Sequence, residues 1–287
     1  MAVAGGTSGQ LQLYFLVWQM PGRRKGMLIF FDIDGTLVGE DGRTMPESAR
    51  SAIQQARANG HICMINTGRT LALVGEEITG QTEFDGLALG CGTMVVYHGE
   101  TLFHKSFTVE ESRRIVEGLR KYRIDACLEG SDNNYLEEEE KIVTDTFREF
   151  LKRFDGYGYD NFDAGLGQFD KFYAYVDDGK KMDAFRQEFE DWLDFVDRKE
   201  GYFEIMPKGC SKASAIELVA KELGISVDET VAIGDSSNDI PMIERAHIGI
   251  AMGNATEDVK EIADFVTDAV EQDGILKALK WLGAVEA

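Results

Sequence analysis

The sequence predicts an α/β fold: a parallel sheet with helices on both faces, and an α+β domain inserted into the chain. Three observations lead to this prediction. Short continuous apolar runs, such as residues 28–31, are typical of parallel strands buried on both faces. Apolar residues at helical spacing follow several of these runs, which indicates strand–helix repeats. Between residues 92 and 207 the strand–helix repeat is interrupted by strand and helix patterns in a different order.

Composition limits the classes of function. The 287 residues suffice for one large domain or two ordinary ones, and 44% hydrophobic with 10% aromatic residues is typical of a globular protein. With 30 basic and 51 acidic side chains the net charge is −21, which argues against nucleic acid or an anionic membrane as the main partner. An anionic substrate must then be attracted locally, by a metal ion and a few cations.

The four cysteines show no paired spacing. They therefore predict free thiols in a reducing cytoplasm, neither a disulfide framework nor a zinc site. These residues are Cys63, Cys91, Cys127 and Cys210.

Residues 1–26 are expected to form a loose N-terminal extension, with Met27 directly before the first strand. The apolar run from Leu11 to Trp18 is too short to span a bilayer. Basic residues follow this run, whereas a secretory signal would place them before it. The alternative is an anchor that lies in a membrane interface.

The first expected strand, residues 28–31, ends in Asp32 and Asp34, and Gly35 then permits a tight turn. In an open α/β sheet this end of a strand borders the ligand crevice. Two adjacent carboxylates repel each other unless a cation or a shared proton intervenes, and Mg²⁺ prefers oxygen ligands and leaves room for phosphate. One aspartate could attack a phosphoryl group while the other transfers a proton. The alternative is a solvated acidic turn.

Three further clusters follow expected elements. The strand at residues 62–65 leads into Thr67-Gly68, whose hydroxyl and backbone N–H groups suit phosphate oxygens. A helix that begins near Lys212 places this cation in the first turn, where it opposes the helix dipole and suggests another task, with Lys208 as the competing candidate. Residues 234–239 bring a third set of acids. Each cluster alone could be an ordinary turn or a surface lysine.

The insertion contains enough elements for a domain of its own. Its expected strands are Met94–His98, Thr101–Phe107, Phe169–Val176, Asp194–Asp197 and Tyr202–Met206, and its expected helices are Val109–Tyr122, Lys141–Phe154 and Lys181–Leu193. Glycines and aromatics between Gly156 and Phe162 could form a specificity loop that closes over a substrate. The favoured alternative is a surface connection whose aromatics pack on their own domain.

Together the four clusters resemble the four motifs of the haloacid dehalogenase superfamily. The matching stretches are Phe31–Leu37, Asn66–Arg69, Lys212 and Gly234–Asp239. An insertion between the second and third motifs is similar to the class IIB cap of Cof-type phosphatases. The resemblance implies a Rossmann-like core at residues 27–91 and 208–287, and a cap that determines substrate specificity at residues 92–207.

The resemblance also implies roles. Asp32 would be the nucleophile that forms an aspartyl-phosphate, and Asp34 would act as general acid and then general base. Mg²⁺ would be held by Asp32, the Asp34 backbone carbonyl and Asp235. The phosphoryl oxygens would be held by Thr67, Gly68, Lys212 and Asn238, and Asp239 would orient Lys212 or a metal-bound water. The implied substrate is a small phosphate monoester, a sugar phosphate or a cofactor phosphate.

Relatives usually carry Asn-Gly after the third strand, where this chain has Cys91-Gly92. Three rival functions stay open from the sequence. A dehalogenase would not need acids at Asp34 and Asp235, and a sugar phosphomutase would return the phosphoryl group to its substrate. A non-catalytic regulatory or binding protein on the same scaffold would be expected to lose one of the acids or the lysine, and all are present.

Overall fold

The computed structural model describes residues 26–152 and 159–286, and the chain divides into two compact units. Of the described residues, the first unit comprises 26–65, 82–85 and 216–286, and the second comprises 66–81, 86–152 and 159–215. The extension predicted at residues 1–26 lies, except for Gly26, outside the described residues. Among the residues that are described, no helix has the length and apolar character needed to cross a membrane.

The sheet of the first unit contains five parallel strands in the order β14-β13-β12-β1-β2. They are β1 (Leu28–Phe31), β2 (Ile62–Asn66), β12 (Thr230–Gly234), β13 (Ile248–Ala251) and β14 (Phe265–Val266). All four side chains of β1 are fully buried, as a parallel strand covered on both faces requires. Phe31 lies opposite Ile233 of β12 and Ile65 of β2, so these central strands end at the same level.

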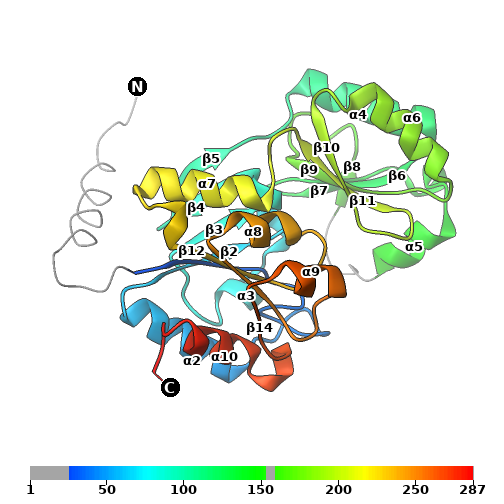
Figure 1. The fold of residues 1–287 in the computed structure, drawn as a ribbon. Coiled ribbons are helices and arrows are strands. Elements are labelled where there is room, and N and C mark those ends of the chain that lie inside the picture. Colours follow the sequence, from blue (N-terminus) through cyan, green and yellow to red (C-terminus); the bar gives the residue numbers. More distant parts are fainter. Residues whose placement is uncertain (1–25, 153–158, 287) are drawn as a thin grey trace, which may run out of the picture. The chain divides into compact units, whose positions relative to one another are not determined.

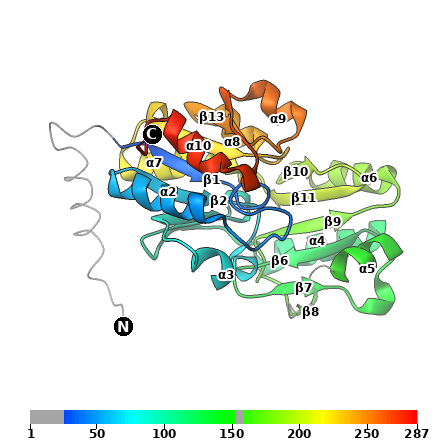
Figure 2. The same ribbon diagram turned by 90° about the horizontal axis from the view of Figure 1, so that it is seen from below.

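Helices cover both faces of this sheet. They are α2 (Glu47–Ala58), α8 (Ile240–Arg245), α9 (Glu257–Ile262) and α10 (Gly274–Trp281), and α7 (Lys212–Leu223) begins in the second unit and continues into the first. Figure 1 shows α8 on one side of the strands and α2 with α10 on the other, and Figure 2 shows α2 and α10 side by side. Ile53 of α2 and Leu279 of α10 are fully buried. The predicted fold class is therefore confirmed.

The second unit contains two sets of strands. An antiparallel set is formed by β3 (Gly86–Leu89), β4 (Met94–Tyr97) and β5 (Glu100–His104). A six-stranded sheet has the order β10-β11-β9-β6-β7-β8, with only the β7–β8 pair parallel. Its strands are β6 (Asp125–Glu129), β7 (Asn134–Leu136), β8 (Tyr159–Asn161), β9 (Lys171–Tyr175), β10 (Leu193–Asp197) and β11 (Tyr202–Pro207).

The helices of the second unit are α3 (Glu76–Thr79), α4 (Val109–Tyr122), α5 (Asp145–Leu151) and α6 (Gly179–Phe189). Helix α4 has the predicted bounds, and a reciprocal pair of bonds between Thr108 and Glu111 caps its N-terminus. Helices α4 and α6 lie side by side in Figure 1, close enough that a Cβ on Gly118 would come within 2.7 Å of the Phe189 ring. Their buried faces share one apolar core with the six-stranded sheet.

The structure differs from the expected insertion in the pairing of β4 and β5 and in three strands that were not predicted, β6, β7 and β8. Strand β4 pairs with β3 on one side and with β5 on the other, and neither β4 nor β5 pairs with a strand of the six-stranded sheet. Strand β6 was not predicted because its sequence begins with Asp125 and ends with Glu129, yet both acids are buried. Asp125 accepts hydrogen bonds from the backbone N–H groups of Val143 and Thr144, and Glu129 pairs with Lys171. Buried acids whose hydrogen bonds are satisfied thus occupy positions that a hydrophobicity pattern predicts to be exposed.

Candidate functional site

Three aspartates of the first unit form a cluster. One carboxylate oxygen from each of Asp32, Asp235 and Asp239 lies within 4.8 Å of the others. Asp32 directly follows β1 and Asp235 directly follows β12, so neighbouring parallel strands deliver them to the same edge of the sheet. Asp32 and Asp239 are buried, and Asp235 is partly buried. The resemblance implied that Asp239 orients Lys212 or a metal-bound water, and in the structure its carboxylate lies beside those of Asp32 and Asp235.

The turn after Asp32 packs tightly against Asp235. Gly35 has a φ of +78°, and a Cβ at this position would lie 2.2 Å from Asp235 Oδ2. Asn254 Nδ2 donates a 2.7 Å hydrogen bond to the Gly35 carbonyl, which holds the turn from the end of β13. Asp34 is exposed and forms an isolated bridge with Val38. Asn254 is a positioning residue that the sequence reasoning missed, although its place after a strand end was a usable signal.

Asp239 shapes the loop that carries Asp235. Its Oδ2 accepts hydrogen bonds from the backbone N–H groups of Asp235 (2.9 Å) and Ser236 (3.0 Å). The Asp235 carbonyl in turn accepts from the Thr256 N–H at 2.9 Å. Asn238 Oδ1 accepts from the Ser236 hydroxyl at 2.8 Å, so this amide also takes part in the loop.

The donor set of the cluster fits a divalent cation. All its ligand atoms are carboxylate oxygens, which suit hard ions such as Mg²⁺ or Ca²⁺. Three carboxylates this close repel one another, and a bound cation removes that repulsion. Because glycine has no side chain, the Asp235 carboxylate can lie directly against the turn at Gly35. The residues present thus match what a divalent metal requires.

A second group of predicted residues lies in the second unit, in the loop that follows β2. The Thr67 N–H donates to the Ala88 carbonyl at 2.9 Å, and the Thr67 carbonyl accepts from the Cys91 N–H at 3.0 Å. The Arg69 N–H donates to Thr67 Oγ1 at 3.2 Å, which occupies an acceptor position of that hydroxyl. Among the described residues, the Gly68 N–H has no hydrogen-bond partner, so it can donate to an anion.

Lys212 is almost completely buried at the start of α7. Its backbone carbonyl accepts a 2.9 Å hydrogen bond from Asn66 Nδ2, which ties the start of the helix to the end of β2. Ser211 caps the helix: the Ser214 N–H donates to Ser211 Oγ at 3.0 Å, and the Ser211 N–H donates to Ser214 Oγ at 2.9 Å. Burial of a lysine at a helix N-terminus is costly in free energy, which favours a functional role for this cation.

The Cys91-Gly92 turn lies against the same helix start. Cys91 has a φ of +55°, a conformation that asparagine and glycine adopt more readily than cysteine. A Cβ on Gly92 would lie 2.4 Å from the Ser211 carbonyl oxygen. Burial, with the neighbouring Glu204 as a smaller contribution, raises the pKa of the Cys91 thiol to about 12. All four cysteines are buried free thiols, as predicted.

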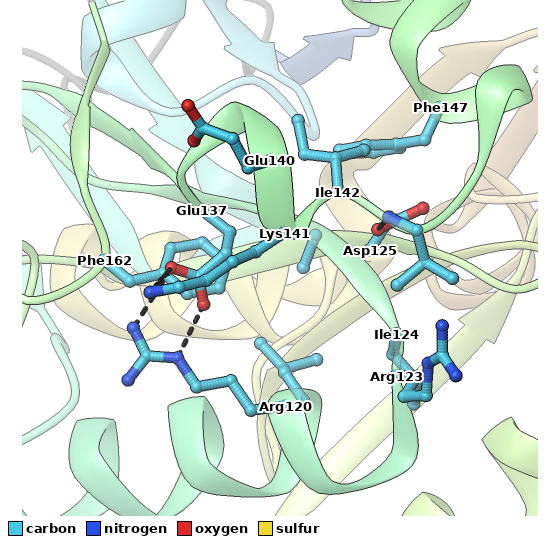
Figure 3. Close-up of a pocket in the computed structure, with 13 residues that line it drawn as sticks. Arg120, Arg123, Ile124, Asp125, Glu137, Glu140, Lys141, Ile142, Phe147 and Phe162 are labelled. Carbon is cyan, nitrogen blue, oxygen red and sulfur yellow. Dashed lines mark hydrogen bonds and ion pairs between the residues drawn. The ribbon is translucent and has the colours of Figure 1, made fainter.

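A separate pocket of about 580 Å³ lies within the second unit, between the end of α4 and the segment before α5 (Figure 3). Two of its charged side chains pair with each other: Arg120 donates to Glu137 at 2.5 and 3.1 Å. Its apolar side includes Phe147 and Phe162. None of the site residues predicted from the sequence lines this pocket.

The aromatics of the expected specificity loop are part of the second unit's packing where they are described. Phe162 is 2% exposed and belongs to the core beneath α4 and α6. Tyr159 packs beside the smaller cluster that contains Phe147. Tyr157 lies outside the described residues. These contacts agree with a connection that packs on its own domain.

Comparisons with known proteins agree with this architecture. The model of the haloacid dehalogenase-like hydrolase family matches residues 29–279. YkrA of Bacillus subtilis (strain 168) is 31% identical over 268 residues, which cover 90% of this chain and 98% of YkrA. The same organism's 5-amino-6-(5-phospho-D-ribitylamino)uracil phosphatase YcsE is 28% identical over 255 residues, or 88% and 94% of the two chains. The solved subclass IIB sugar phosphatase BT4131 has a TM-score of 0.77 at 25% identity, covering 90% of this chain and all of BT4131.

Proposed function

Because the chain belongs to the haloacid dehalogenase-like hydrolases, we propose that it is a magnesium-dependent phosphatase that works through an aspartyl-phosphate intermediate. The phosphatase class follows from the family and from relatives that match nearly the whole chain. The observation that carries the finer proposal is the buried aspartate cluster beside the turn at Gly35. It combines a nucleophile candidate with the donor set for a hard cation.

In this proposal Asp32 attacks the phosphorus atom, and the alcohol leaves. Asp34, exposed two residues later, gives the leaving oxygen a proton and then removes one from the water that hydrolyses the acyl phosphate. A magnesium ion held by Asp32, Asp235 and the Asp34 carbonyl, with Asp239 nearby, would neutralise charge on the phosphoryl group. Asp239 also keeps Asp235 in place through its two backbone bonds.

The loop after β2 and the start of α7 would supply the remaining contacts to the phosphoryl oxygens. The Thr67 hydroxyl, the Gly68 N–H, the Lys212 ammonium and the Asn238 amide are the proposed donors. Support comes from the chain itself: Asp32 directly follows Phe31 of β1, and Thr67 comes two residues after Ile65 of β2, which pairs with Phe31. Phosphoryl transfer depends mainly on such positioning and on neutralising charge.

We propose sugar phosphates or cofactor phosphates as the substrates. YcsE is named for a phosphorylated ribityl compound, and BT4131 is named as a sugar phosphatase. Both kinds of substrate are small phosphate monoesters. The inserted residues 92–207 would form the cap that selects among them, over a core of residues 27–91 and 208–287. Four buried free thiols support a cytoplasmic location. The net charge of −21 argues against nucleic acid as a substrate.

The test is a screen of the purified protein against a panel of phosphorylated metabolites with Mg²⁺ and with EDTA. We expect hydrolysis of one class of small esters, loss of activity in EDTA and recovery with Mg²⁺, with Ca²⁺ a poor substitute because it prefers looser coordination. Asp32→Asn should abolish turnover. Full activity after exhaustive chelation would contradict the metal-dependent mechanism, and transfer of phosphate from a sugar bisphosphate to a second sugar would indicate a mutase.

A further inference from the structure

The second unit contains a buried ion cluster that the proposed chemistry does not use. Lys171, on β9, is 1% exposed, and its Nζ lies 2.7 Å from Glu129 Oε2 and 3.1 Å from Glu204 Oε1. A third contact, of 3.2 Å, joins Nζ to the backbone carbonyl of Gly68. Arg198 approaches the far side of Glu204 at 3.8 Å. Burial alone would lower the pKa of Lys171, but the two carboxylates raise it, so the ammonium keeps its charge.

The ammonium group of Lys171 has three N–H donors, and these three acceptors account for all of them. Its charge is also balanced locally by the two carboxylates. Lys171 therefore has no N–H donor left for a phosphate, and its charge is already neutralised. It cannot bind the phosphoryl group directly, which is the role proposed for Lys212. Within the part of the chain that the structure describes, the one hydrogen bond of Lys171 outside the ion cluster is to the Gly68 carbonyl.

This carbonyl belongs to the peptide that joins Gly68 to Arg69. The N–H of the same peptide donates to Thr67 Oγ1 at 3.2 Å. Because a peptide is planar, a bond that fixes its carbonyl also fixes the direction of its N–H. An acceptor position of the Thr67 hydroxyl is thereby filled, and its proton is left to donate to another group. The neighbouring carbonyls of Thr67 and Arg69 are held by backbone N–H groups of Cys91 and Gly90, whereas Gly68 depends on a side chain 103 residues away.

We infer that Lys171 is a positioning residue, which through the Gly68–Arg69 peptide orients the Thr67 hydroxyl for an incoming phosphoryl group. The inference rests on the proposed function. Glu129 and Glu204 hold the ammonium in place by accepting its other two hydrogens. Since a displacement of about 1 Å in a positioned group can cost about 10²-fold in rate, loss of this contact should affect catalysis and not only stability.

The experiment must separate positioning from folding, because Lys171→Met leaves two buried carboxylates without their cation. A triple variant, Lys171→Met with Glu129→Gln and Glu204→Gln, removes the unbalanced charge and is expected to restore most of the lost stability. Lys121→Met is the matched control, because this lysine pairs with Glu188 on the surface of the same unit. For each protein we would measure the melting temperature, kcat and KM for para-nitrophenyl phosphate, and inhibition by inorganic phosphate.

We expect the triple variant to lose about 10- to 100-fold in kcat/KM and to bind phosphate several-fold more weakly, while the control matches the parent. Hydrogen–deuterium exchange over residues 66–73 should be faster in the triple variant than in the control. If the triple variant regains parental kcat/KM together with its melting temperature, or if exchange over residues 66–73 is unchanged, Lys171 is only structural. A parent protein without phosphatase activity would refute the proposed function instead, and the exchange measurement would still test the contact.

Discussion

The contact between Gly35 and Asp235 allows a sharp test of the proposed metal site. In a Gly35→Ala variant the new Cβ would lie 2.2 Å from Asp235 Oδ2 and 2.6 Å from its Cγ. Since such contacts are essentially never shorter than 3.0 Å, the carboxylate must move by about 0.8 Å. Mg²⁺ demands near-ideal octahedral geometry with oxygen distances defined to about 0.2 Å. We therefore expect Mg²⁺ to bind at least about tenfold more weakly.

Alanine at a positive φ also strains the backbone by about 1–2 kcal/mol, so a control must carry the same strain. Gly99 provides it, with a φ of +79° against +78° for Gly35 and nothing within 4 Å of an added Cβ. Isothermal titration with Mg²⁺, with the melting temperature alongside, should show weak binding for Gly35→Ala and parental binding for Gly99→Ala. Parental Mg²⁺ affinity in Gly35→Ala would show that Asp235 is not a ligand of the ion.

Three further predictions follow from the structure. In Asp34→Asn, turnover of an aryl phosphate should fall about 10²- to 10⁴-fold while phosphate accumulates on Asp32, which mass spectrometry of acid-quenched protein would detect; parental turnover would contradict the proposed roles. Phe162→Ala should lower the free energy of unfolding by about 3–5 kcal/mol and leave the ranking of substrates unchanged. An altered ranking would show that this segment helps to select the substrate. Because its pKa is raised to about 12, the Cys91 thiol should resist iodoacetamide at pH 8 in the native protein, and rapid labelling found by peptide mapping would contradict its burial.

Most of the first unit could be predicted because its strands are continuous apolar runs and its helices have regular apolar faces. The same logic identified the acids at Asp32 and Asp235, since parallel neighbours end at one edge of the sheet. The tight packing of Gly35 against Asp235 could not be predicted, because it depends on how two loops meet in space.

The inserted region was harder to predict because its sheet contains buried charges. Strand β6 carries acids at both ends, and Lys171 is the first residue of β9, directly after Asp170. In sequence these residues are indistinguishable from solvent-exposed ones. Their burial depends on distant partners: those of Asp125 lie 18 and 19 positions away, and Lys171 pairs with carboxylates 42 and 33 positions away. The order of strands, with β4 and β5 joined to β3, likewise depends on long-range pairing.

The hydrogen bonds of Asp239 have a consequence for the order in which the proposed metal site assembles. The Asp235 N–H is held by Asp239 and the Asp235 carbonyl by Thr256, so the backbone of this residue is fixed by protein groups alone. An arriving ion would not have to organise the loop, and little conformational entropy would be lost when it binds. Loading and release of the ion could then be repeated without any unfolding. The metal would be an exchangeable cofactor. The fold would not depend on it, in contrast to small domains that fold only around a structural zinc ion.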